Sequence, residues 1–262
     1  SGVGDLDTNQ ARSVLERTTV NLQPYIGVNE EAIYGSTGTD DLETALQLLH
    51  LWFTAPQFDE TVLDSVIESD QQYLDDPAAN PDMAAYVAAT TARYGDDLRY
   101  APAPTQAQLD SITVEDLERA FTARIASPGD WVFVISGDVD QDVATELMRR
   151  YVGTLPKAGG TEVASDVVPD LPPGVVSVDV RAGTGEQGSL NLVFEVPSDG
   201  LDFEFVSADV LTKVLDTRLV DHIREELGAS YSPTSYVQVD QYVDVVRTTV
   251  SVSGDPAGLD EL

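Results

Sequence analysis

The sequence predicts an α+β fold of two similar α/β units, each an antiparallel or mixed sheet with helices on one face, and the second truncated at its C-terminal end. Helix-spaced and strand-like apolar runs alternate along the chain. Residues 156–173 are rich in Gly, Pro and small polar residues and lack apolar periodicity, which is typical of a linker. A strand, a Gly turn and a helix start recur at one spacing in Val134 to Asp138 (Val-Ile-Ser-Gly-Asp) and Ser251 to Asp255 (Ser-Val-Ser-Gly-Asp), as expected for two copies of one unit.

The second copy stops inside its helix at Leu262, whereas the first continues to Tyr151. We therefore expect Leu262 to be a truncation point. The predicted boundaries are 1–157 for the first unit, 158–173 for the linker and 174–262 for the second unit.

Turn, capping and periodicity signals place the elements of the first unit. In order, they are a helix at 7–16, strands at 18–26 and 31–37 joined through Asn29, helices from Asp40 to before Pro56, from Asp59 to Asp75 and at 82–94, a helix from Thr113 through Phe121, a buried-type strand at 131–136, and a helix at 140–151.

Capping residues mark two of these helix starts. Asp40 is followed three residues later by Glu43, and Thr113 is followed by Asp116, which is the spacing of a capping box. Apolar residues at helical spacing then predict the buried faces of the two helices that begin at Asp40 and Asp59. These residues are Leu42, Leu46, Leu49 and Phe53 in the first helix, and Val62, Val66 and Ile67 in the second.

The second unit has fewer predicted elements. They are strands at 175–180 and 190–196, a helix at 203–227 that Gly228 ends as a left-handed cap, and strands at 236–239 and 243–252. The apolar stripe predicted for the long helix consists of Leu211, Val214, Leu215, Leu219 and Ile223.

The charge balance excludes several classes of partner. The chain has 46 acidic and 14 basic residues, a formal net charge of -32, and no cysteine. Phosphate backbones and anionic lipids require clustered Lys and Arg, so we exclude nucleic acid and membrane surfaces as partners. We interpret the acidity as a solvated, self-repelling surface and not as an acidic binding patch. The absence of cysteine excludes a disulfide framework and a thiolate nucleophile.

Histidine is scarce, and this limits metal chemistry. His50 lies beside the apolar stripe of its helix and is expected to be structural. His222 to Glu226 resembles an inverted zinc motif, His-x-x-Glu-His, in which Glu226 replaces the second histidine. A catalytic zinc usually needs three protein ligands, so we predict no metal site in this chain.

Residues 183–188 match the spacing of a dinucleotide-binding fingerprint. In that fingerprint the last Gly opens a helix, whereas residues 189–196 have the pattern of a strand. A hairpin turn is therefore the preferred interpretation.

The segment from Ile223 to Ser232 (Ile-Arg-Glu-Glu-Leu-Gly-Ala-Ser-Tyr-Ser) combines a helix end, a Gly turn and a strand start. A functional and a structural interpretation are both open for its polar residues. Arg224 could offset the helix dipole, and Tyr231 could pack at a sheet edge.

This segment resembles the Arg-Glu-Glu-Leu-Gly-x-x-Tyr stretch of the pitrilysin and insulin-degrading-enzyme family of zinc metallopeptidases. Residues 35–56 are similar to the second half of the long bacterial members, in the pyrroloquinoline-quinone-associated group. Residues 113–121, 131–138 and 151–156 resemble further parts of the family in the same order.

The resemblance implies that this chain is the C-terminal, non-catalytic half of a clamshell peptidase, with its two units as the third and fourth domains. Zinc would be bound by the N-terminal half, and none is expected in this chain, which alone would be inactive. Arg224 and Tyr231 match the pair that this half contributes across the cleft. The resemblance implies that both bind substrate and that Tyr231 also stabilises the oxyanion.

The partners implied are an N-terminal zinc-bearing half, in the same polypeptide or in another subunit, and unfolded peptide substrates. The alternative is a non-enzymatic structural or processing-complex subunit of the same fold. A His-x-x-Glu-His motif upstream of Ser1 would favour the enzyme.

Overall fold

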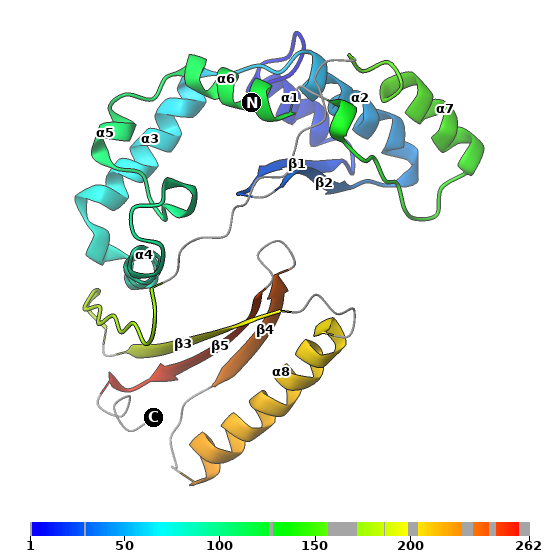
Figure 1. Ribbon diagram of the computed structural model, residues 1–262. Helices are drawn as coiled ribbons and strands as arrows, with labels where there is room; N and C mark the ends of the chain where they lie inside the picture. The colour runs from blue at the N-terminus through cyan, green and yellow to red at the C-terminus, as the bar shows by residue number, and fades with distance from the viewer. Residues whose placement is uncertain are drawn as a thin grey trace. The chain divides into compact units, whose positions relative to one another are not determined.

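The computed structural model describes residues 2–28, 30–125, 128–156, 172–185, 187–198, 204–226, 233–240 and 245–256 (Figure 1). The described residues up to 181 form one compact unit and those from 182 onward form a second. Both units combine helices with small antiparallel sheets, which confirms the predicted α+β class. The predicted linker at 158–173 lies almost entirely outside the described residues, so the domain boundaries stay a prediction.

The first unit follows the predicted order of helices closely. Its elements are α1 (Thr8–Leu15), β1 (Asn21–Ile26), β2 (Glu31–Ser36), α2 (Leu42–Thr54), α3 (Glu60–Asp75), α4 (Pro81–Tyr94), α5 (Gln106–Leu109), α6 (Val114–Ile125) and α7 (Gln141–Tyr151). β1 and β2 form an antiparallel hairpin in which Asn21 pairs with Ser36 and Ile26 with Glu31. None of the helices in the described ranges is both long and apolar enough to cross a lipid bilayer.

Side-chain caps begin most of these helices, because the first N–H groups of a helix have no partner within it. The predicted capping box of α6 is confirmed. The Thr113 N–H donates to the Asp116 carboxylate at 3.0 Å, and the Asp116 N–H donates to the Thr113 hydroxyl at 3.2 Å. The cap predicted for α2 is wrong, because a 3₁₀ turn at Thr39–Asp41 precedes the helix and places Asp41, not Asp40, at the N-cap.

Asp41 does not cap α2 with its side chain and instead ties α2 to the start of the hairpin. Its carboxylate accepts hydrogen bonds from the N–H and the hydroxyl of Thr19, both at 2.8 Å, and the same hydroxyl accepts from the Gly38 N–H at 2.7 Å. The backbone hydrogen bond from Thr19, followed by the one from its hydroxyl, lowers the pKa of Asp41.

We expect the Asp41→Ala variant to melt below wild type at pH 7, with a gap that closes toward pH 3. A carboxylate whose pKa is lowered by folding stabilises the protein above its unfolded pKa of about 4 and loses this effect as the pH falls through the folded value. Thermal melts at both pH values measure the gap. Asp40→Ala is the matched control, because it removes the same charge from an exposed neighbour without a contact to Thr19. An equal gap in both variants would contradict the prediction.

α2 is the central helix of the first unit. The predicted stripe is confirmed for Leu42, Leu46 and Phe53, which are 4–8% exposed, while Leu49 is half-buried between two clusters. Burying one such side chain contributes about 1.5–3 kcal/mol. The buried members of the three core clusters are Val3, Ala11, Val20, Ala45 and Leu48; Leu42, Leu46 and Leu147; and Phe53, Ile125 and Leu155.

The buried face of α3 differs from the predicted one. Val62 and Val66 are 38% and 54% exposed, whereas Leu63 is buried and Ile67 half-buried. Leu63 and Ile67 are four residues apart and lie on one face of the helix, and Val62 and Val66 are each rotated by about 100° from it. The apolar pattern therefore identified the helix but selected a neighbouring face.

Residues 131–136, predicted as a strand, pair with no other strand in the described structure. The side-chain alternation of a strand is nevertheless present. Trp131 and Phe133 pack against Phe53, while Val132 and Val134 are 86% and 81% exposed. The alternation of apolar residues shows only that one side of the segment is buried. A strand also needs a neighbouring strand with which to form hydrogen bonds.

The described residues of the second unit form a three-stranded antiparallel sheet with one long helix. Its elements are β3 (Gly188–Pro197), α8 (Glu204–Val220), a π-helical turn (Asp221–Glu226), β4 (Thr234–Asp240) and β5 (Val245–Gly254). The order in the described sheet is β3-β5-β4, with α8 alongside β4 (Figure 1). Residues 175–180, predicted as a strand, pair with no other strand among the described residues, and Val175 is 98% exposed.

The stripe predicted for α8 is partly wrong. Ile223 is buried and Leu219 packs against it, but Leu211 and Val214 are 42% and 50% exposed. Ala208 is buried in their place. The buried stripe thus begins on a small residue, to which a hydrophobicity pattern gives little weight.

Candidate functional site

The C-terminal end of α8 carries Arg224, the first of the two predicted site residues. Arg224 lies in the π-helical turn Asp221–Glu226, where one extra residue per turn replaces the i→i−4 hydrogen bonds of the α-helix. π-helical turns are rare overall, but those that occur are often found at functional sites. The structure describes the backbone of Arg224 but not its side chain, and Tyr231 and Gly228 lie outside the described residues. The pairing of Arg224 with Tyr231 therefore stays a prediction.

The π-helical turn is anchored to the sheet through its third residue. Ile223 is 5% exposed and packs against Val250 and Val252 of β5, together with Leu219 of α8. The residue that immediately precedes Arg224 is thus part of the core of the second unit. Arg224 consequently follows a fixed backbone position.

His50 has the structural role that the sequence predicts. Its Nδ1 lies 2.7 Å from the backbone oxygen of Tyr151, the last residue of α7, and its ring meets the Tyr151 ring edge-on at a centroid distance of 6.3 Å. The carbonyls at a helix C-terminus have no partner within the helix. His50 therefore joins α2 to the end of α7.

Three polar side chains reinforce the same junction. The Tyr151 hydroxyl donates to the Glu43 carboxylate at 2.7 Å and accepts from the Gln47 side-chain amide at 2.9 Å. Arg150 donates to the same carboxylate at 3.1 Å. These side chains hydrogen-bond to one another, so the network helps to hold α2 against the end of α7.

His222, the other histidine, lies exposed in the π-helical turn. Within the described ranges, no three His, Cys, Asp or Glu side chains are grouped so that they could hold a metal ion.

Residues 183–188, considered above as a dinucleotide fingerprint, lead into β3 and not into a helix. Gly183 has a φ of +78°, as a turn requires. The predicted hairpin is absent from the part of the chain that the structure describes, because residues 175–180 do not pair as a strand there.

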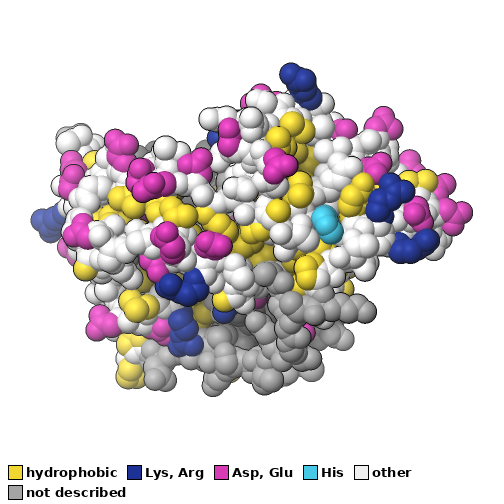
Figure 2. All heavy atoms as spheres, turned by 90° about the horizontal axis from the view of Figure 1, so that it is seen from above, with side chains coloured by type: hydrophobic (Ala, Val, Ile, Leu, Met, Phe, Trp, Pro, Cys, Tyr) yellow, Lys and Arg dark blue, Asp and Glu magenta, His cyan; other side chains and the backbone are white. Residues whose placement is uncertain are grey.

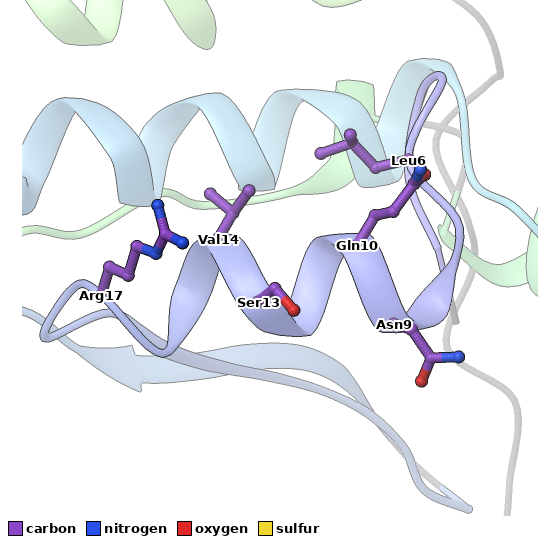
Figure 3. A pocket seen from close by; sticks show the side chains of 6 residues that line it. All are labelled: Leu6, Asn9, Gln10, Ser13, Val14 and Arg17. Carbon is purple, nitrogen blue, oxygen red and sulfur yellow. The ribbon is translucent and has the colours of Figure 1, made fainter.

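A shallow groove runs along α1 (Figure 3). It has a volume of about 630 Å³ and is lined by Leu6, Asn9, Gln10, Ser13, Val14 and Arg17. Figure 3 shows Val14 and Arg17 projecting to one side of α1 and Asn9 to the other. The lining has one cation, no carboxylate and no histidine, and therefore offers no acid–base pair for catalysis.

Acidic side chains are spread over the face shown in Figure 2 and are not gathered at one place. Many of the described cations are paired with nearby carboxylates. The pairs include Arg99–Asp97, Arg119–Asp116, Arg124–Glu31, Arg149–Glu146, Arg150–Glu43, Lys213–Asp209 and Arg247–Glu195. Pairing of this kind leaves the surface of the described residues dominated by negative charge.

The chain resembles known proteins along its full length. Residues 111–262 match the family described as peptidase M16 inactive domain. The probable zinc protease PqqL of Escherichia coli is 23% identical over 273 residues, an alignment that covers 100% of this chain and 28% of that protein. The chain thus spans less than a third of the length of the curated relatives that it matches.

Many solved structures share the fold, including the following two. The crystal structure of the periplasmic protease PqqL from Escherichia coli matches with a TM-score of 0.83 and 21% identity, covering 100% of this chain and 29% of that one. A mutant of the ferredoxin protease FusC in complex with Arabidopsis ferredoxin matches with a TM-score of 0.77 and 16% identity, covering 100% and 28%.

Proposed function

The chain belongs to the peptidase M16 family, whose inactive domain it matches over residues 111–262, and from this premise we propose that it is the substrate-clamping C-terminal half of a zinc-dependent endopeptidase. The family match carries the proposal, since it covers more than half of the chain and describes a domain other than the catalytic one. The relatives described as probable zinc proteases support it. We place the zinc in the N-terminal half.

In this proposal the chain contributes two side chains to peptide hydrolysis. Zinc bound by the other half would supply an activated water. The Arg224 guanidinium hydrogen-bonds a carbonyl of the bound peptide, with the fixed geometry of its planar fork. The Tyr231 phenol donates to the oxyanion that forms when the scissile carbonyl is attacked. The π-helical turn around Arg224 supports this location, because π turns are enriched at functional sites.

The proposed partners are the zinc-bearing half, in the same polypeptide or in a second subunit, and an unfolded polypeptide substrate. Among the relatives, the FusC mutant was solved in complex with a protein, ferredoxin. For the present chain we propose peptides as substrates without assigning a sequence preference.

A peptidase assay with metal analysis tests the proposal directly. We expect this chain alone to hold no stoichiometric zinc and to cleave no unfolded polypeptide. Mixing or fusing it with the preceding half should produce cleavage that the zinc half alone does not reach. Heat-denatured chain added to the zinc half is the control. Stoichiometric zinc and turnover in the isolated chain would overturn the assignment, as would full activity of the zinc half alone.

A further inference from the structure

Two backbone N–H groups of β4 are bound by side chains of α8. β4 lies at one edge of the described sheet, and alternate N–H groups of an edge strand point away from its neighbour. The Ser235 N–H donates to Asp216 Oδ1 at 2.6 Å, and the Val237 N–H donates to the Thr212 hydroxyl at 3.2 Å. The helix therefore takes the place of a further strand at these two positions.

Asp216 is the strongest acceptor in this contact. The Ser235 hydroxyl also lies 2.8 Å from Asp216 Oδ1, and it lies 3.2 Å from the Thr212 backbone oxygen. The Thr212 hydroxyl donates in turn to the Ala208 carbonyl at 2.9 Å, which leaves its oxygen free to accept from Val237. These contacts are all partly buried, and hydrogen bonds to a carboxylate are about twice as strong as neutral ones.

The contact between Asp216 and Ser235 joins the two elements that flank the predicted site. Asp216 precedes Arg224 by about two helical turns on the same helix. Ser235 lies in the strand that begins soon after Tyr231 in the sequence. One carboxylate oxygen thus holds together the helix that leads into Arg224 and the strand that follows Tyr231.

Building on the proposed function, we infer that Asp216 is a positioning residue, which sets the helix end at Arg224 against the start of β4 so that the site residues meet the substrate in register. The helix end is held to the sheet at two points. Ile223 packs against β5 one residue before Arg224, and Asp216 binds β4 about two helical turns earlier. Catalytic geometry is sensitive at this scale, because a displacement of about 1 Å can cost about a hundredfold in rate.

Two substitutions at Asp216 separate positioning from charge. Asp216→Ala removes the acceptor from both Ser235 hydrogen bonds. Asp216→Asn keeps an oxygen that can occupy the Oδ1 position and should restore most of the function, because both hydrogen bonds are made to that single atom.

Two control variants isolate the effect further. Glu195→Gln breaks a half-buried ion pair with Arg247, 2.8 Å long, between β3 and β5, so it weakens the same unit away from α8. Asp209→Ala removes an exposed carboxylate that pairs with Lys213 on α8 itself.

In the complete enzyme, we expect Asp216→Ala to lower kcat by about ten- to a hundredfold, with KM changed by less than about twofold. Asp216→Asn should recover kcat to within about threefold of wild type, by the same geometric reasoning. All assays are run below the melting onset of every variant. A wild-type kcat in Asp216→Ala, or an equal loss in Glu195→Gln, would overturn the proposal.

A measurement that does not depend on enzymatic activity tests the positioning role independently of the proposed function. In Asp216→Ala, amide hydrogen exchange should rise across residues 221–237 and stay unchanged in β3. In Glu195→Gln, it should rise in β3 and stay unchanged across residues 221–237. Unchanged exchange at 221–237 would overturn the positioning role. If Arg224→Ala and Tyr231→Phe keep wild-type turnover, the proposed site fails and exchange alone decides whether Asp216 sets the helix end. If those two variants lose turnover and Asp216→Ala does not, only the positioning role fails.

Discussion

Replacing Tyr231 by Phe in the complete enzyme is expected to lower kcat on peptide substrates by about 10²- to 10³-fold, the usual cost of removing one oxyanion donor. The substitution deletes a single hydroxyl and keeps the aromatic ring. KM should therefore change little, because the hydrogen bond strengthens only as charge develops on the substrate oxygen. Steady-state kinetics on an unfolded polypeptide, together with a thermal melt of each variant, measure both effects.

The chain offers a matched control for this substitution. Tyr236 lies in β4 of the same unit and is 62% exposed. Tyr236→Phe removes the same hydroxyl from the same residue type, and we expect it to retain the wild-type kcat. If Tyr231→Phe turns over at the wild-type rate, or if both variants lose activity equally, Tyr231 is not an oxyanion donor.

Helix boundaries were the most predictable part of the fold, because the signals that begin a helix are local. Asp59, Thr113 and Asp140 each cap the N–H groups of the next few residues, and each was recognisable from its position before an apolar run. The helix end at Asp75 also agrees with its prediction, since the Pro that follows cannot continue the hydrogen bonding.

Strands and helix faces were harder to predict, because they depend on residues far away in the sequence. Residues 131–136 have the alternation of a strand and partly bury Trp131 and Phe133, but no described neighbour supplies hydrogen bonds. In α3 the apolar residues cover more than one face, and packing against other elements decides that Leu63 is buried and Val66 is not. Neither outcome could be calculated from one segment alone.

The candidate site was also predictable from the sequence only in part. Arg224 and Tyr231 were identified by resemblance, since a helix end followed by a Gly turn is common and their residue types alone also fit structural roles. The π-helical turn at Arg224 has no recognised signal in the sequence. The contact of Asp216 with Ser235 joins residues 19 positions apart, and both are ordinary polar residues in the sequence. Only the packing of α8 along β4 shows that they meet.

The Phe53→Ala variant is expected to lose about 3–5 kcal/mol of unfolding free energy from the first unit, as large core truncations do. Phe53 is 4% exposed and packs beside Ile125, which is fully buried, and Leu155. Its ring meets the ring of Trp131 at a centroid distance of 5.2 Å. Truncation would leave a cavity among side chains from several elements, which cannot collapse together to fill it.

Val66→Ala is the control for this variant, because Val66 is 54% exposed in the same unit and its loss should cost less than about 0.5 kcal/mol. Denaturant unfolding followed by residue-resolved hydrogen exchange separates the two units. If residues 158–173 form a linker between independent domains, Phe53→Ala should raise exchange throughout the first unit and leave Val250 and Val252, in the core of the second, protected as in wild type. A simultaneous loss of protection in both cores would mean that the units unfold as one, and the predicted boundary would then be wrong.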